Sequence, residues 1–174
     1  MHDTQPKSPP QVAARAPRAM LGIILQAGGF FLVWGIRPHR AFSASVPRNS
    51  ASMTVLAASA ILAVASLVLV FVSIRYLGRH WAIQARTVEG HTLVTTGPYG
   101  LVRHPIYLGM GGFLVAIGLV LAPWWALALA CVFYLVGAQI RIRAEDALMA
   151  STFGEAFEVY RKRVPALIPF TRAA

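Results

Sequence analysis

The sequence predicts an all-α integral membrane protein with four transmembrane helices, the last two forming a tight hairpin. Three observations support this fold class. Of the 174 residues, 57% are hydrophobic and only 13% are charged, whereas ordinary soluble domains carry about 25% charged residues. Long uncharged runs alternate with short polar segments. The basic residues gather at the ends of these runs, where the headgroups of anionic lipids would lie.

Three uncharged runs define the helices in order. Residues 19–36 and 49–74 are each close to the about 20 residues that a spanning helix needs. Residues 105–140 form a run too long for one span, and its middle reads Ala122-Pro123-Trp124-Trp125. Because proline cannot continue a helix interior and tryptophan prefers the membrane–water interface, we expect two short spans within 105–140.

The chain therefore divides into three parts. Residues 1–18 are rich in proline, alanine and basic residues, so we expect a disordered tail. Residues 19–77 hold the first two transmembrane helices, and residues 78–174 hold the hairpin and two polar segments. The first apolar run exceeds the 7–15 or so residues of a signal-peptide core, so we expect a retained span.

Charge predicts the orientation of the helices. With four spans, thirteen of the sixteen lysines and arginines lie on the side of both termini, and only Arg37, Arg40 and Arg48 lie opposite. The positive-inside rule places the first group in the cytoplasm, and all six acidic residues share that side. We expect a multi-pass protein with a cytoplasmic active site, in the inner membrane if it is bacterial. The net charge of +10 fits membrane lipids as partners better than nucleic acid.

Two groups of polar residues flank the predicted hairpin. Residues 103–107 read Arg-His-Pro-Ile-Tyr, which suits either an interfacial anchor or a helix N-terminus that binds an anion or carbonyl. Arg141 and Glu145 are four residues apart and share a helix face, either at a solvated helix end or beside a membrane-embedded pocket. A short hairpin brings His104 close to Arg141, which predicts one composite site.

Other kinds of site find no support in the pattern. The spacing of His80, His91 and His104 matches no metal motif, and Cys131 stands alone. Neither a glycine-rich phosphate loop nor a nucleophile elbow occurs. We therefore expect no metal site, and the residues alone do not name a reaction.

The stretch HTLVTTGPYGLVRHPIYLG, followed by R-x-x-x-E-D-x-x-L and FGEAFEVYRKRVPALIP, resembles the isoprenylcysteine carboxyl methyltransferase family. The resemblance covers residues 78–169, about half the chain. It implies that residues 78–174 are catalytic and that cytoplasmic helical segments form a pocket for S-adenosylmethionine. The cofactor contacts implied are Gln84, His91, Thr92, Leu93, Val94, Tyr99, His104, Pro105, Ile106, Tyr107 and Glu145.

The resemblance also implies two catalytic residues. Arg141 matches a family position that faces the substrate, and Arg103 is a second candidate. Asp146 stands where the family usually has glutamate, so we leave it outside the expected site. The implied acceptor is a lipophilic or small molecule, most simply the carboxylate or thiol of an isoprenoid-like substrate. Alternatives are a phospholipid amine N-methyltransferase, an NADPH-dependent membrane reductase of the sterol-reductase type, and a non-enzymatic membrane scaffold.

Overall fold

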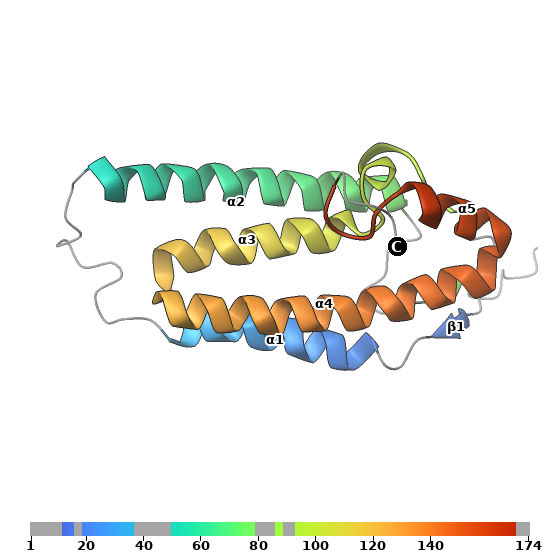
Figure 1. The fold of residues 1–174 in the computed structure, drawn as a ribbon, viewed down its shortest axis with the longest axis horizontal. Coiled ribbons are helices and arrows are strands. Elements are labelled where there is room, and N and C mark those ends of the chain that lie inside the picture. Colours follow the sequence, from blue (N-terminus) through green and yellow to red (C-terminus); the bar gives the residue numbers. More distant parts are fainter. Residues whose placement is uncertain (1–11, 16–18, 37–49, 79–85, 89–92, 170–174) are drawn as a thin grey trace, which may run out of the picture.

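The computed structural model describes residues 12–15, 19–36, 50–78, 86–88 and 93–169. Within these ranges four long helices lie side by side, with a short helix and turns gathered at one end (Figure 1). The helices are α1 (Ala19–Gly35), α2 (Ser50–Leu77), α3 (Pro105–Leu121), α4 (Trp124–Phe153) and α5 (Glu155–Arg163), with a 3-10 turn, η2 (Gly97–Gly100). The described residues thus confirm the predicted helical fold.

Small residues let the long helices pack closely in two pairs, α1 with α4 and α2 with α3. A Cβ atom added to Gly22 of α1 would lie 2.6 Å from the carbonyl oxygen of Gly137 of α4. A Cβ on Gly109 of α3 would lie 2.8 Å from the carbonyl oxygen of Ser66 of α2. Backbones this close are typical of helix packing in membranes, where small residues replace the hydrophobic effect as the means of association.

The break between α3 and α4 lies where the sequence predicts it. α3 ends at Leu121 and α4 begins at Trp124, and the Ala122 N–H closes the last turn of α3 by donating to the Gly118 carbonyl at 3.0 Å. Pro123 is the N-cap residue of α4 with an extended backbone. The chain therefore reverses in two residues, and α4 runs back along α3 and past its start toward α5 (Figure 1).

Two helices are long and apolar enough to cross a membrane: Ser52–Leu77, with 26 residues, and Trp124–Phe153, with 30. α1 and α3 are apolar but shorter, with 17 residues each. Large apolar side chains face outward, as Ile61 and Phe71 do on α2, with 71% and 60% of their surface exposed. This outward apolar surface suits lipid, while the number of crossings stays a prediction.

A small two-stranded sheet departs from the all-helical prediction. Strand β1 (Val12–Arg15) lies inside the tail that composition predicts to be disordered, and it pairs antiparallel with β2 (Arg86–Val88). Composition weighs whether a segment can bury a core of its own. Composition cannot indicate that a partner strand, more than 70 residues away in the sequence, satisfies the backbone hydrogen bonds of β1.

Candidate functional site

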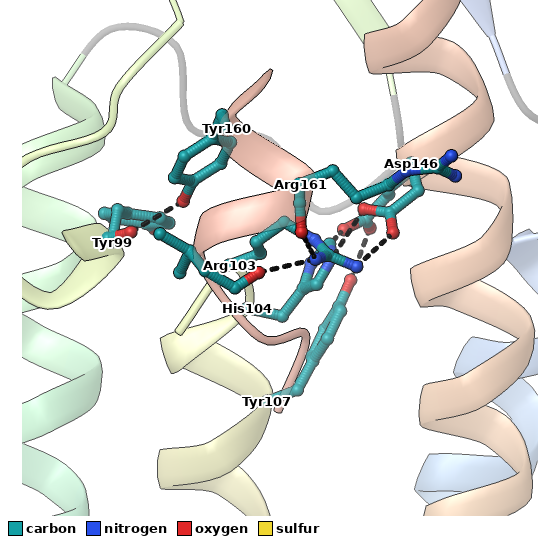
Figure 2. Close-up of polar contacts among 9 residues, drawn as sticks. Tyr99, Arg103, His104, Tyr107, Asp146, Tyr160 and Arg161 are labelled. Carbon is teal, nitrogen blue, oxygen red and sulfur yellow. Dashed lines mark hydrogen bonds and ion pairs between the residues drawn. The ribbon is translucent and has the colours of Figure 1, made fainter. Parts of the chain in front are cut away.

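Polar side chains from the start of α3 and from α4 meet at one end of the bundle, next to backbone carbonyls at the end of α5 (Figure 2). We call this group the polar network, and it comprises Arg103, His104, Tyr107, Arg141, Glu145 and Asp146. All six are at least partly buried. Since buried polar groups must find partners or pay a desolvation penalty, the contacts among them decide what each can do.

Arg103 joins the start of α3 to the C-terminal segment. It is 7% exposed, and its guanidinium donates to Asp146 Oδ2 at 2.9 Å and to the carbonyl oxygens of Arg161 and Val164 at 3.0 and 2.6 Å. Its backbone N–H donates to the Pro165 carbonyl at 2.8 Å. A guanidinium with this many charge-assisted bonds is held firmly. Its bonds to its own chain make it a clamp on the end of α5.

His104 bridges the two carboxylates of α4. Its Nε2 lies 2.9 Å from Asp146 Oδ1 and its Nδ1 lies 3.4 Å from Glu145 Oε2. Burial lowers the pKa of this imidazole, but hydrogen bonds to Asp146 and Glu145 outweigh burial and raise the pKa above its ordinary value of 6.5. The protonated imidazole can donate to both carboxylates at once, so it holds them at fixed positions next to the start of α3.

Glu145 connects His104 to Arg141. The Tyr107 hydroxyl donates to Glu145 Oε1, and Arg141 Nη2 lies 3.7 Å from the same oxygen. The Arg141 guanidinium stands over the Tyr107 ring, 4.7 Å from its centroid, a distance suited to a cation–π contact. The shared contacts with Glu145 confirm the predicted approach of His104 and Arg141 across the hairpin. Arg141 is only 8% exposed, so the solvated-end interpretation of this residue is wrong.

α1 enters the network through Gln26, which the sequence reasoning missed. Arg141 Nη1 donates to Gln26 Oε1 at 3.0 Å, and Gln26 is 2% exposed. The signal was present, because Gln26 is the one side chain with an amide or a charge in the apolar run 19–36. A polar side chain inside such a helix normally faces a partner rather than lipid.

Tyr99 and Leu93 lie against α5 rather than within the polar network. The Tyr160 hydroxyl donates to the Tyr99 carbonyl at 2.6 Å, and the Tyr99 hydroxyl donates to the Ser73 carbonyl at 3.4 Å. Leu93 packs on a cluster of Phe157, Tyr160 and the residue after α5, Val164. Burial raises the pKa of the Tyr99 and Tyr160 hydroxyls. Both therefore stay protonated donors near neutral pH and fix α5 over η2.

The remaining predicted residues divide into two groups. Pro105 and Ile106 form the first turn of α3, with Pro105 fully buried, and Val94 is half-buried beside Leu93. The other three lie outside the described residues: Gln84, His91 and Thr92. Among the residues that the structure does describe, no group of three or more His, Cys, Asp or Glu side chains could hold a metal ion.

Asp146 is central to the network although the sequence reasoning left it out. It accepts from Arg103 and lies within hydrogen-bond distance of His104, both at 2.9 Å. The shorter reach of aspartate suggested a residue outside the site. In the structure this short reach suits a carboxylate that α4 presents directly to the start of α3.

A profile of the isoprenylcysteine carboxyl methyltransferase (ICMT) family matches residues 58–151. This range covers more than half of the chain and contains all six residues of the polar network, but neither Gln26 nor the segment that Arg103 clamps. The chain belongs to the ICMT family. Membership in this family and two long apolar helices together support a membrane protein.

Curated relatives are similar to part of the chain. The cobalt-zinc-cadmium resistance protein CzcN of Cupriavidus metallidurans is 39% identical over 106 residues, which cover 56% of this chain and 45% of that protein. The protein-S-isoprenylcysteine O-methyltransferase of Schizosaccharomyces pombe is 36% identical over 89 residues, covering 50% and 37%. The Arabidopsis thaliana enzyme B of the same name is 37% identical over 89 residues, covering 51% and 45%. The chain thus spans less than half the length of these relatives.

Proposed function

We propose that this ICMT-family protein is an S-adenosylmethionine-dependent membrane methyltransferase that acts on a lipophilic or small acceptor. One observation carries the proposal. The residues matched by the family profile, 58–151, include both halves of a buried polar network, one from the start of α3 and one from α4. A scaffold without chemistry has no need of three charged pairs among side chains that are at most one-fifth exposed, because such burial is costly.

The polar network suits the polar groups of S-adenosylmethionine. Glu145 keeps 19% of its side chain exposed, and its Oε2 lies 3.4 Å from His104 Nδ1. This carboxylate can therefore accept a further hydrogen bond from a ribose hydroxyl or an amino group. The rings of His104 and Tyr107 stack with centroids 5.7 Å apart and stiffen the same side of the site. We propose that the eleven residues implied by the family resemblance surround the cofactor.

The bound cofactor would supply a methyl group on a sulfonium, which an acceptor displaces in line. A carboxylate or thiolate acceptor needs no general base, so the protein has to orient the acceptor and exclude water. We propose that Arg141 binds the anionic acceptor, since its guanidinium lies beside Tyr107 and Glu145. Arg103 bonds one carboxylate and two carbonyls of its own chain, so we assign it to positioning rather than to acceptor contact.

Two alternatives fit the geometry less well. Membership in the ICMT family favours methyl transfer over NADPH-dependent reduction. A phospholipid amine would have to lose a proton to become a nucleophile. Asp146 is a poor base for this step, because hydrogen bonds from His104 and Arg103 outweigh burial and lower the pKa of its carboxyl. An acceptor that arrives as an anion avoids this difficulty.

The proposed topology has four helices crossing the membrane with both termini and the polar network on the cytoplasmic side. All six network residues belong to the side of the chain where thirteen of the sixteen basic residues lie. The apolar outer surfaces of α1 and α2 would contact lipid. A lipophilic acceptor could then approach the network from the membrane while the cofactor enters from water.

Calorimetry of the full chain in detergent distinguishes a protein that binds S-adenosylmethionine from one that binds NADPH. We expect S-adenosylhomocysteine, the demethylated product, to bind and NADPH to give no heat beyond dilution. Binding of NADPH with no response to S-adenosylhomocysteine would contradict the proposal and restore the reductase alternative.

A further inference from the structure

Only one of the two polar atoms in the side-chain amide of Gln26, on α1, has a hydrogen-bond partner among the described residues. Its Oε1 accepts the hydrogen bond from Arg141 Nη1 at 3.0 Å, while its Nε2 has no hydrogen-bond partner among the described residues. The side chain is 2% exposed. A buried amide donor without a partner costs free energy, so this N–H group is either a defect or a place where a ligand oxygen completes the bonding.

The position of this donor suggests which ligand group it meets. The nitrogen and oxygen of one amide share a carbon atom, so Nε2 lies beside the Arg141 guanidinium that Oε1 accepts from. Two neighbouring donors, one of them cationic, match the two oxygens of a carboxylate. Arg141 also contacts Tyr107 and Glu145, where we place the cofactor.

Helix packing holds Gln26 in register with Arg141. A Cβ on Gly22, one turn before Gln26, would lie 2.5 Å from Arg141 Cγ, and a Cβ on Gly137 would lie 3.0 Å from the Gln26 backbone nitrogen. The backbones of α1 and α4 are therefore nearly in contact at this level. This close packing fixes the level of Gln26 on α1 relative to Arg141 on α4.

We propose that Gln26 and Arg141 together bind the carboxylate of the methyl acceptor, with the amide N–H of Gln26 and the guanidinium each donating to one oxygen. This assignment rests on the proposed function. It makes α1, which lies outside the residues matched by the family profile, part of the acceptor site.

Gln26→Leu tests the assignment, because leucine fills similar space in an apolar helix and has no polar atom. We expect the KM for a prenylated cysteine analogue with a free carboxylate to rise at least about tenfold, while the Kd for S-adenosylhomocysteine stays within about twofold. Turnover of a prenylated thiol that lacks the carboxylate should stay within about threefold. Gln26→Met serves as a second variant if the leucine variant fails to fold.

Val33→Ala is the matched control. Val33 lies on the same face of α1 seven residues further along and is fully buried against Leu114 and Tyr134, away from Arg141. This variant should not distinguish the two acceptors. Equal losses on both acceptors in Gln26→Leu would show a structural role for α1 and overturn the inference, as would a wild-type KM.

The inference and the proposed function fail in different ways. If the wild-type protein methylates thiols but no carboxylate-bearing acceptor, the carboxylate site is overturned and methyl transfer stands. If the wild-type protein neither binds S-adenosylhomocysteine nor transfers a methyl group to any acceptor, the proposed function itself is overturned.

Discussion

Two buried arginines at the same end of the bundle contact different kinds of partner. Arg103 donates to Asp146 and to the carbonyls of Arg161 and Val164, so its partners are mostly backbone atoms of the segment around the end of α5. Arg141 contacts the side chains of Gln26, Glu145 and Tyr107, and these belong to three different helices.

The difference supports our proposal that Arg103 holds the fold and Arg141 binds a ligand. Backbone carbonyls cannot turn away without unfolding the segment that carries them, so Arg103 is committed to structure. Side chains can rotate and exchange partners, and the neighbour Gln26 has an amide N–H to spare. Resemblance to a family implies that both arginines take part in the reaction, whereas their partners lead us to propose positioning for Arg103 and acceptor binding for Arg141.

The largest effect should come from breaking the Arg103 side. Arg103→Ala leaves Asp146 without its guanidinium and two carbonyls without a donor. Removing one partner of a buried ion pair costs about 3–5 kcal/mol, and the two side chains here are 5% and 14% exposed. We expect a loss of stability of that order, measured by thermal melting in detergent. Arg143→Ala, at an exposed position on α4, is the control and should change stability little.

The Arg141 side should respond in turnover rather than in stability. Arg141→Lys keeps a positive charge but loses the planar fork that fixes a carboxylate. We expect turnover on an anionic acceptor to fall at least about 100-fold, or ~2.7 kcal/mol of transition-state stabilisation. The affinity for S-adenosylhomocysteine should stay within about threefold. Unchanged turnover in this variant would make Arg141 a membrane anchor and would contradict the proposal that Arg141, unlike Arg103, binds the acceptor.

Glu145→Ala tests whether Glu145 contacts the cofactor rather than the acceptor. A hydrogen bond to a charged group contributes about 1.5–3 kcal/mol, so the affinity for S-adenosylhomocysteine should drop at least about tenfold in calorimetry. Glu158→Ala removes a half-exposed carboxylate paired with Arg161 and should leave the affinity unchanged, since exposed pairs contribute little. An unchanged Kd in Glu145→Ala would place the cofactor elsewhere.

The smallest effect concerns His104, which contacts both Asp146, the partner of Arg103, and Glu145, the partner of Arg141. Its pKa in the folded protein is raised above 6.5 by Asp146 and Glu145 against the effect of burial. The stability this gives is fully present below the unfolded pKa and is lost as pH rises through the folded pKa. The melting temperature should therefore decline as pH rises above about 6.5, more steeply in the wild type than in His104→Gln. Parallel curves would show that His104 does not titrate in this range.

Local patterns predicted the parts of the molecule that depend on neighbours in sequence. Proline and tryptophan at residues 123–125 placed the hairpin break, and the four-residue spacing put Arg141 and Glu145 on one face. The parts that depend on distant segments escaped prediction. The β1–β2 pairing, the clamp of Arg103 on the end of α5, and the contact of Gln26 with Arg141 each join residues more than 50 positions apart.

Asp146 escaped for another reason. Its distance from His104 depends on how far α4 stands from α3, and a sequence motif carries no such distance. The adjacent Glu145 was found because its spacing from Arg141 is fixed within a single helix. Tertiary distance thus limits sequence reasoning even where the motif is already in view.

Methyl transfer itself tests the central claim most directly. The full chain in detergent is incubated with S-adenosylmethionine labelled in its methyl group and with a prenylated cysteine analogue. We expect labelled methyl groups in the organic phase that alkali releases as methanol, because a carboxyl methyl ester hydrolyses in base and a thioether does not. No labelled product from any carboxylate or thiol acceptor, in a preparation that melts cooperatively, would contradict the claim that this protein is a methyltransferase.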